Sequence, residues 1–187
     1  MSLNEQSLVI ACQNGDTDAF GSLYDEYIQK IYNFIYYKTH HKETAEDITS
    51  QTFFQALNHI DQCDPNQHFS SWLYRIARNA VTDHYRALQP SVAIEDVWDL
   101  ADTSDVAHTV DTTQALESIA VFMKGLPSVQ RDVLMLRFWQ DMSFAEIAEI
   151  IGKSEDNCKV ICSRALTQLR KTMPMLISLL LMIKTIL

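Results

Sequence analysis

The chain has 187 residues, is 47% hydrophobic and carries a net charge of −9 at pH 7. Its hydrophobic content is ordinary for a globular protein and excludes general disorder, while its length suits one or two domains. Only four glycines and four prolines occur, which favours an all-α chain with short turns. No segment alternates with period two for long enough to predict a strand, and no glycine-rich phosphate loop is present.

The negative charge is concentrated in one short segment. Residues 1–88 carry −5, residues 89–112 carry −6 and residues 113–187 carry +2. Because 89–112 has neither lysine nor arginine and no sustained apolar period, it is predicted to be a flexible acidic linker. We therefore expect two small helical domains, at 1–88 and 113–173, joined by this linker and followed by an apolar tail at 174–187.

Four amphipathic helices are predicted in the first domain, at 3–13, 19–39, 43–60 and 69–88. The third is expected to turn these side chains inward: Ala45, Ile48, Thr52, Phe53, Ala56, Leu57 and Ile60. Phe54 falls on a mixed face of the same helix and is a candidate partner contact, although a second buried side explains it equally well.

The helix at 69–88 carries a polar stripe separate from its apolar one. The stripe comprises Arg75, Arg78, Asn79, Thr82, Asp83 and Arg86. Arginine and asparagine are typical contacts of phosphates and base edges. Nearby Phe69, Trp72 and Tyr74 could stack on unpaired bases. A solvated helix face beside an aromatic core is the simpler alternative, so this stripe alone does not establish nucleic-acid binding.

In the second domain, helices are predicted at 113–126 and 128–140, the latter capped by Ser128. A helix-turn-helix follows. Ser143 and Glu146 have the spacing of a capping box, and Gly152 suits a turn with positive φ. Ser154 then caps a basic helix that runs to about residue 171. A helix-turn-helix places such a helix in the DNA major groove, whereas an ordinary helical hairpin is the alternative.

The remaining features predict no chemistry. Four scattered cysteines suit buried free thiols in a reducing compartment, and we expect no metal, cofactor or catalytic site. The apolar run at 175–183 is shorter than the roughly 18 residues that span a bilayer, so stable membrane insertion is not expected. The tail could pack on its own domain, bind a partner or lie at a membrane surface. No signal peptide is recognised, and we expect a cytoplasmic protein.

In this order, the motifs resemble those of bacterial RNA polymerase sigma factors of the extracytoplasmic-function group, over residues 5–172. Ala45-Glu46-Asp47-Ile48 with Thr52-Phe53 resembles the polymerase-binding helix. Phe69, residues 72–79, Asp83 and Arg86 resemble the segment that opens and reads the minus-ten element. Leu126-Pro127, Gln130-Arg131, Val133-Leu134, Ile147-Ala148 and Gly152 resemble the domain that reads the minus-thirty-five element.

The resemblance implies a non-enzymatic subunit that directs core RNA polymerase to promoters, without a small-molecule substrate, and an anti-sigma factor as its regulator. The implied polymerase contacts are Asp47, Gln51, Phe53 and Phe54. The implied minus-ten contacts are Arg75, Arg78, Asn79, Asp83 and Arg86. The implied minus-thirty-five contacts are Asn157, Lys159, Ser163 and Arg164.

Three departures from the family pattern matter, one of which is the apolar tail at 174–187. Ser50 and Gln51 stand where the family often has Gln and Glu, and Ile161 stands where an arginine is common. Three other functions remain open from the residues alone: a free-standing DNA-binding regulator, a helical adaptor without promoter function, and a membrane-surface protein.

Overall fold

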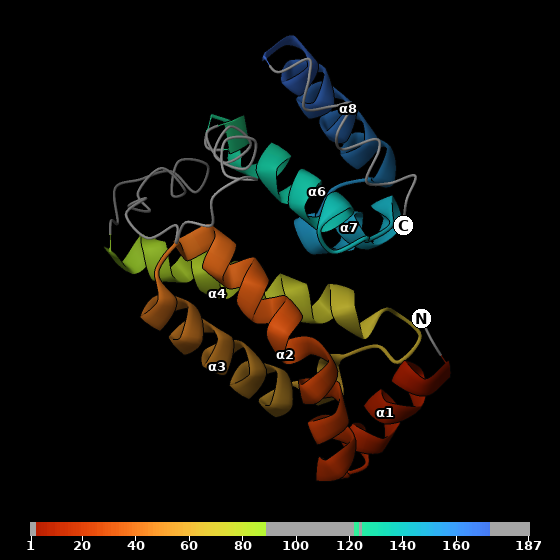
Figure 1. The fold of residues 1–187 in the computed structure, drawn as a ribbon. Coiled ribbons are helices and arrows are strands. Elements are labelled where there is room, and N and C mark those ends of the chain that lie inside the picture. Colours follow the sequence, from red (N-terminus) through yellow and green to blue (C-terminus); the bar gives the residue numbers. More distant parts are fainter. Residues whose placement is uncertain (1–2, 89–121, 124, 173–187) are drawn as a thin grey trace, which may run out of the picture.

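The computed structural model describes residues 3–88, 122–123 and 125–172, and every regular element in these ranges is helical. The elements are α1 (Leu3–Gln13), α2 (Thr17–Thr39), α3 (Lys42–Asn58), the short 3-10 helix η1 (Ile60–Gln62), α4 (Phe69–Leu88), α6 (Ser128–Phe138), α7 (Phe144–Ile151) and α8 (Glu155–Thr172). They form two helical units, with α6, α7 and α8 on the α4 side of the first unit (Figure 1). The prediction of an all-α chain with two domains is confirmed. The predicted linker 89–112 and tail 174–187 lie outside the described residues.

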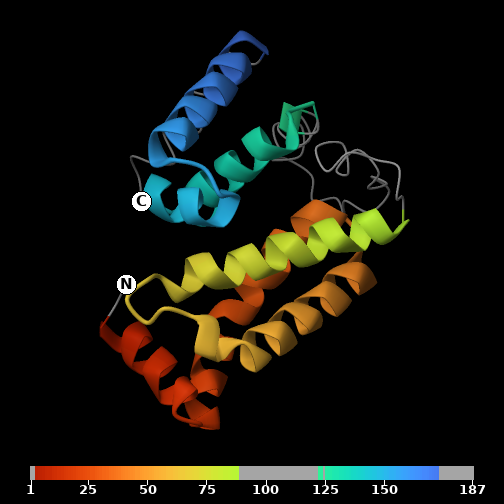
Figure 2. The ribbon, with the colours of Figure 1, turned by 180° about the vertical axis from the view of Figure 1, so that it is seen from behind.

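In the first domain, α2, α3 and α4 pack side by side and α1 crosses the amino-terminal half of α2 (Figures 1 and 2). Asp16 begins α2 as its N-cap, because its Oδ1 accepts hydrogen bonds from the amides of Asp18 and Ala19 at 2.9 and 3.1 Å. His40 ends α2 in the left-handed region, and His41 caps α3 by accepting a hydrogen bond at Nδ1 from the Thr44 amide. The two helices are therefore joined by a tight turn, which fixes their antiparallel packing.

A continuous apolar core holds α4 in place. Its largest fully buried side chains in this domain are Val9, Leu23, Ile31, Phe34, Ile35, Phe69, Leu73, Tyr74 and Val81. The rings of Phe34 and Tyr74 meet edge to face at 5.1 Å. Each such side chain contributes about 1.5–3 kcal/mol when it is removed from water. Since α4 is anchored along one whole side, its polar stripe has a fixed direction.

The third helix differs from its predicted form. It ends at Asn58, and residues 60–62 turn into η1 instead of continuing the helix to 60. Leu57, predicted to face inward, is 45% exposed. The reason is geometric, since Leu57 follows buried Ala56 by about 100° around the helix and thereby leaves the buried arc.

The second domain is built on the helix-turn-helix that the sequence predicts. The capping box is confirmed: the Ser143 amide donates to Glu146 Oε2 at 2.8 Å, and the Glu146 amide donates to Ser143 Oγ at 3.2 Å. Gly152 has a φ of 72°, and Ser154 Oγ accepts a hydrogen bond from the Asn157 amide at 3.3 Å. These contacts set the angle between α7 and α8.

The helix before the helix-turn-helix differs from its prediction in two details. Pro127, rather than Ser128, is the N-cap of α6, and Ser128 is buried in the first turn. The helix ends at Phe138, two residues early, because Asp141 adopts a φ of 50° in the turn that leads to α7. Of the helix predicted at 113–126, residues 122–123 are helical, while 113–121 and 124 lie outside the described residues.

Candidate nucleic-acid and partner interface

The solvent side of α3 presents aromatic and apolar surface beside a carboxylate. Phe54 is 66% exposed and adjoins exposed Asp47 and Gln51 on the helix. Phe53 was predicted as a partner contact, but it is only 4% exposed, and its ring meets that of Tyr24 at 4.7 Å. The prediction for Phe53 is therefore wrong as a surface contact, since the side chain belongs to the core.

Leu57, one turn after Phe54 on α3, is exposed and extends its apolar surface, and exposed Tyr24 on α2 contacts the neighbouring Phe53. Leu57 was predicted to face inward, and neither residue was predicted to lie on the surface. An apolar residue at the edge of a helical stripe is the signal that could have identified them.

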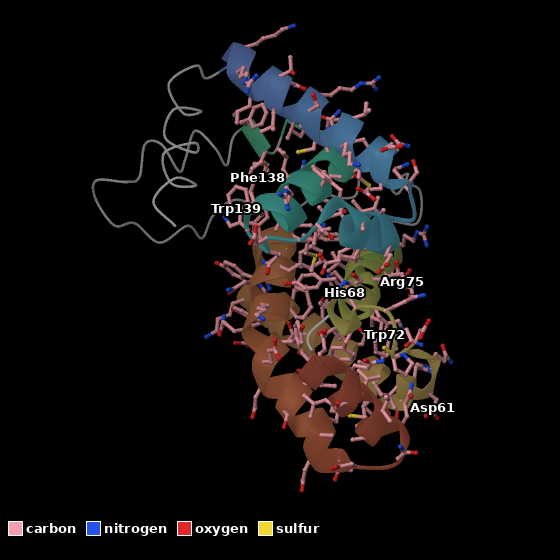
Figure 3. The ribbon with its side chains drawn as sticks, turned by 90° about the vertical axis from the view of Figure 1, so that its right-hand side faces the viewer. Asp61, His68, Trp72, Arg75, Phe138 and Trp139 are labelled. Carbon is pink, nitrogen blue, oxygen red and sulfur yellow. The ribbon has the colours of Figure 1, made fainter. Side chains whose placement is uncertain are left out.

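The polar stripe of α4 is largely open to solvent. Arg75, Asn79, Asp83 and Arg86 are exposed. A groove of about 350 Å³ is lined by Arg78, Asn79, Thr82, Asp83 and Arg86. Figure 3 shows Arg75 and Trp72 near the amino-terminal end of the helix. Phe69 and Tyr74 are fully buried, so their predicted stacking on bases is wrong, whereas Trp72 is half-buried.

Arg78 differs from the other members of the stripe because it is bound to the second domain. Its Nε donates to Asp132 Oδ2 on α6 at 3.0 Å. The second carboxylate oxygen, Oδ1, accepts a hydrogen bond from Lys38 Nζ on α2. The side chains of Lys38 and Asp132 are 0% and 1% exposed. Burial lowers the pKa of Lys38 to about 8, an effect that the charge of Asp132 opposes.

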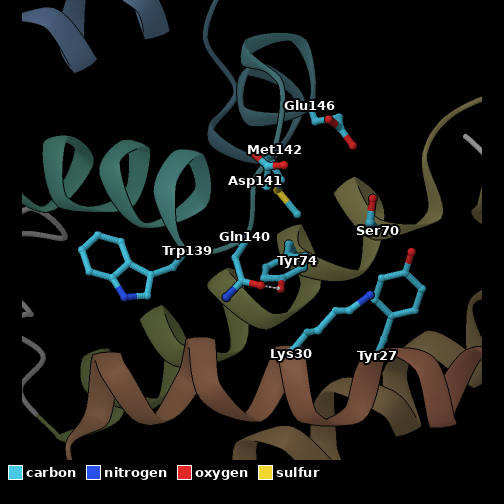
Figure 4. Close-up of a pocket in the computed structure, with 9 residues that line it drawn as sticks. All are labelled: Tyr27, Lys30, Ser70, Tyr74, Trp139, Gln140, Asp141, Met142 and Glu146. Carbon is cyan, nitrogen blue, oxygen red and sulfur yellow. Dashed lines mark hydrogen bonds between the residues drawn. The ribbon is translucent and has the colours of Figure 1, made fainter. Parts of the chain in front are cut away.

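Further polar contacts accompany this ion cluster. The Tyr74 hydroxyl donates to Gln140 Oε1 at 2.6 Å (Figure 4), and burial raises the pKa of Tyr74. His68 Nδ1 lies 3.7 Å from Glu146 Oε1, so the capping-box carboxylate also faces the first domain. We call this set of contacts between the domains the seam: Lys38, His68, Tyr74 and Arg78 on one side and Asp132, Gln140 and Glu146 on the other.

The seam is not fully packed. A cavity of about 360 Å³ opens beside the bond from Tyr74 to Gln140 (Figure 4). Its walls come from both domains: Tyr27, Lys30, Ser70, Tyr74, Trp139, Gln140, Asp141, Met142 and Glu146. None of these contacts between the domains was predicted from the sequence.

The predicted minus-thirty-five residues all lie on the solvent side of α8. Asn157, Lys159, Ser163 and Arg164 are exposed. Lys159 Nζ forms ion pairs with Glu155 at 2.8 Å and with Asp156 at 3.4 Å, which raise its pKa. Lys159 and Ser163 line a shallow hollow of about 250 Å³ together with Phe144, Cys162, Leu166, Thr167 and Arg170. Thr167 and Arg170 are candidate contacts that the sequence analysis missed.

The other side of α8 explains its unusual sequence. Cys158 and Cys162 are buried, as are Cys12 and Cys63, which confirms their prediction as core thiols. Ile161 is half-buried against the same core, so packing accounts for an apolar residue there. In the described ranges, no cluster of His, Cys, Asp or Glu could hold a metal ion, and no described helix is long and apolar enough to cross a membrane.

Comparisons with known proteins match both helical domains to one family of proteins. The family model for Sigma-70 region 2 matches residues 23–90, and that for Sigma-70 region 4 matches residues 122–171. The ECF RNA polymerase sigma factor BldN of Streptomyces coelicolor is 34% identical over 178 residues, which cover 92% of this chain and 67% of BldN. The RNA polymerase sigma factor YlaC of Bacillus subtilis is 31% identical, over 83% of this chain and 92% of YlaC.

These matches define a class of protein. The chain belongs to the sigma-70 family of RNA polymerase sigma factors. Within that family it is a member of the extracytoplasmic-function group, whose members bind core RNA polymerase and direct transcription to specific promoters.

Solved structures show the same fold. CnrH, solved in complex with the cytosolic domain of CnrY, has a TM-score of 0.71 at 21% identity, over 90% of this chain and 96% of that chain. The sigma factor RpoE of Bartonella quintana, solved with the anti-sigma factor NepR, has a TM-score of 0.69 at 19% identity, over 83% of this chain and 97% of that chain.

Proposed function

We propose that α3, α4 and α8 divide the work of a non-enzymatic specificity subunit. In this proposal α3 docks on core polymerase, α4 engages the minus-ten element and α8 reads the minus-thirty-five element. The observation that carries it is the presence of three chemically distinct exposed faces on elements whose opposite sides are anchored in apolar cores. The domains at 1–88 and 113–173 would thus each hold one DNA-binding face.

The α3 face has the composition of a protein contact. Phe54 is a large exposed aromatic side chain, of the type that dominates binding energy at interfaces when a partner buries it. Asp47 and Gln51 supply polar contacts at its rim. Because Phe53 is buried, exposed Leu57 and Tyr24 are the side chains proposed to complete the apolar part of this contact.

The α4 face has the composition of a DNA contact. Arg75, Arg78 and Arg86 can bind phosphates, and Asn79 can hydrogen-bond a base edge. Asp83 Oδ1 lies 3.5 Å from Arg86 Nη1, so the two exposed side chains form an ion pair within this face. Half-buried Trp72 is the aromatic side chain that remains available to stack on an unpaired base.

The α8 face is proposed to enter the major groove. The second helix of a helix-turn-helix contacts base edges with its amino-terminal residues, and Asn157 and Lys159 occupy the first turns of α8. Ser163 and Arg164 follow on the same exposed surface, with Thr167 and Arg170 further along.

We further propose an anti-sigma factor as the regulator and the cytoplasm as the compartment. The support is the family, together with two proteins of the same fold, CnrH and RpoE, each of which was solved in complex with a second protein. No enzymatic step is assigned to the chain, because core polymerase performs the chemistry.

Run-off transcription with purified core polymerase over a promoter library tests this proposal. Specific transcripts are expected only when the protein is added. Asp47→Arg should abolish them while far-UV circular dichroism stays unchanged. The matched control is Asp25→Arg, the same charge reversal at an exposed position of α2. Absence of transcripts and of core binding with the unchanged chain would refute the function.

A further inference from the structure

The last helix and the residues after it share a charge pattern that the proposed function does not explain. Residues 157–187 include five lysines and arginines and no aspartate or glutamate. Within this segment lies the apolar run 175–183, in which Ser178 is the only polar residue. We propose that residues 164–187 bind reversibly to the surface of an anionic membrane. In this arrangement the apolar run enters the headgroup boundary and the basic residues contact lipid phosphates.

The basic side chains of α8 gather on one side of the helix. The exposed ones are Lys159, Arg164, Arg170 and Lys171. At 100° per residue they fall within an arc of about 140°, while the opposite side of α8 packs in the core of the second domain. Lys159 is paired with Glu155 at 2.8 Å. Arg164, Arg170 and Lys171 are therefore the side chains of α8 that would meet lipid phosphates, and the last two come just before the apolar run.

The neighbouring end of α8 has a polar surface. Every exposed side chain in 163–171 is polar or charged, and none of the large exposed hydrophobic side chains of the described residues lies in 161–171. A helical segment that is apolar on all sides is stable only when a protein core or lipid covers it. Among the described residues, the end of α8 offers no apolar surface that could cover the run 175–183, and a lipid surface would supply one.

The apolar run and the basic face together supply the two signals that membrane-surface binding needs. A single short apolar anchor gives only marginal, reversible binding, and a polybasic patch beside it stabilises the contact. Each lysine or arginine near an anionic surface raises the affinity about fivefold. Because the run is shorter than the roughly 18 residues that span a bilayer, the combination predicts binding at the surface that responds to salt.

The charge of the rest of the chain limits where a membrane could bind. Residues 1–88 and 89–112 carry net charges of −5 and −6, whereas residues 113–187 carry +2. An anionic surface repels the first two segments and attracts the third. The contact is therefore expected at the basic end of the second domain, with the first domain directed away from the lipid.

The membrane would use side chains that the proposed function assigns to DNA. Lipid phosphates and DNA phosphates bind a guanidinium in the same way, through charge-assisted hydrogen bonds to its N–H groups. A chain bound to lipid through Arg164 and Arg170 could not present them to the minus-thirty-five element. This consequence rests on the proposed function, whereas the membrane binding itself does not.

Flotation of the full chain with lipid vesicles tests the binding. The chain should float with vesicles of equal parts phosphatidylcholine and phosphatidylglycerol. It should bind vesicles of phosphatidylcholine alone at least about tenfold more weakly, because the basic residues lose their anionic partners. High salt should release the chain, since exposed charges are screened. Absence of flotation, or binding that high salt does not release, would overturn the inference.

A pair of charge variants measures the contribution of the basic face. Arg170→Gln combined with Lys171→Gln should weaken binding to the anionic vesicles about 25-fold, at about fivefold per residue. Lys30→Gln combined with Lys42→Gln removes two exposed lysines from the first domain and should change binding by less than about twofold. An equal loss in both variants would overturn the inference, because net charge alone would then drive the binding.

A second pair of variants tests the apolar run. Leu180→Gln combined with Ile183→Gln should weaken vesicle binding by at least about tenfold, since two large apolar side chains would no longer favour the lipid. Leu180→Met combined with Ile183→Leu keeps the run apolar and should bind as the unchanged chain does. Binding that survives the two glutamines would overturn the inference. A lower melting temperature of the glutamine variant without lipid would also overturn it, because the run would then belong to the protein's own core.

Run-off transcription in the presence of vesicles tests the shared use of α8. Anionic vesicles should reduce transcription from a promoter that needs the minus-thirty-five element, and phosphatidylcholine vesicles should not. The variant with Leu180→Gln and Ile183→Gln should be insensitive to both. Unchanged transcription despite flotation would overturn the shared use of α8. Absence of transcripts without any vesicles would instead refute the proposed function, and the flotation result would be unaffected.

Discussion

The two proposed DNA faces use similar side chains but differ in what must be released before they bind. On α4, Arg78 is held by Asp132, a carboxylate of the other domain that is 1% exposed. On α8, Lys159 is held by Glu155, a carboxylate of its own helix whose side chain is 50% exposed. Exposed pairs of this kind contribute about 0–1 kcal/mol, whereas breaking a buried pair costs about 3–5 kcal/mol. Releasing Arg78 from its carboxylate would therefore cost more free energy than releasing Lys159 from its own.

The largest expected effect comes from unfolding the second domain selectively. Ile147 on α7 is fully buried, so Ile147→Ala should lower the stability of this domain by about 2–5 kcal/mol. Amide hydrogen exchange should then accelerate across 128–172 before it changes in α2. The α8 face would be lost, while the α4 face would be uncovered and would bind the minus-ten strand more tightly.

Ile161→Ala is the control for this variant, because Ile161 is only half-buried and its truncation should lower the stability of the domain less. Equal acceleration of exchange in both domains would contradict the comparison, since it would mean that the domains unfold as one unit.

The next effect concerns the open face. Arg164→Ala should weaken binding of the polymerase complex to promoters with a minus-thirty-five element by about 1–3 kcal/mol, if Arg164 contacts a base edge. Binding to the minus-ten strand alone should not change. Fluorescence anisotropy with matched duplexes, with and without the upstream element, measures both. A uniform loss on both duplexes would argue for a phosphate contact.

Alkaline pH should loosen the first domain more than the second. Burial raises the pKa of Cys63 to about 11 and raises those of Cys12 and Tyr27, whereas in the second domain the described thiol with a raised pKa is Cys158. Groups with raised pKa values contribute stability that is present below their ordinary pKa and is lost as pH rises through the raised value. Lys38 has the opposite effect on stability: because its pKa is lowered to about 8, its loss of a proton at alkaline pH favours the folded state.

Urea denaturation should be measured from about pH 8 to about pH 11, which are close to the limits of these titrations. The free energy of unfolding should fall over this range, and it should fall less steeply with pH in Cys63→Ala. A slope that Cys63→Ala leaves unchanged would show that this thiol does not titrate as its burial implies.

The smallest expected effect tests the local restraint on α8. Glu155→Gln removes the 2.8 Å ion pair with Lys159 and should strengthen promoter binding by about two- to fivefold, the range of an exposed pair. The dependence of affinity on salt should steepen, since Lys159 would then neutralise a phosphate more completely. Glu149→Gln, which removes a charge at an exposed position of α7, controls for net charge. A steeper salt dependence in both variants would attribute the effect to overall charge.

The elements that were predicted correctly are those whose signals lie within a few residues. The capping box of Ser143 and Glu146 and the turn at Gly152 are local, and they fix α7 and α8. The same holds for the polar stripe of α4, which follows from helical periodicity alone. The exposure of Leu57 was missed because periodicity does not define the edge of a buried arc to within one residue.

The seam could not be predicted in this way. Lys38 and Asp132 are 94 positions apart in sequence, and the pattern of neither helix indicates which residue of the other domain its charge would meet. Their pairing depends on how the two domains dock, which no short pattern encodes. The hydrogen bond from Arg78 to Asp132 could not be predicted for the same reason.

The Lys38–Asp132 contact also constrains how this protein can be recombined. A chimaera that keeps residues 1–88 but takes its second domain from a relative without an acidic residue at the position of Asp132 would carry an ammonium inside α2 with no carboxylate opposite it. Among relatives whose domains pack in this way, substitutions at these two positions should therefore occur together. Domain exchange in this group would then be limited by a buried charge pair between the domains as well as by surface complementarity.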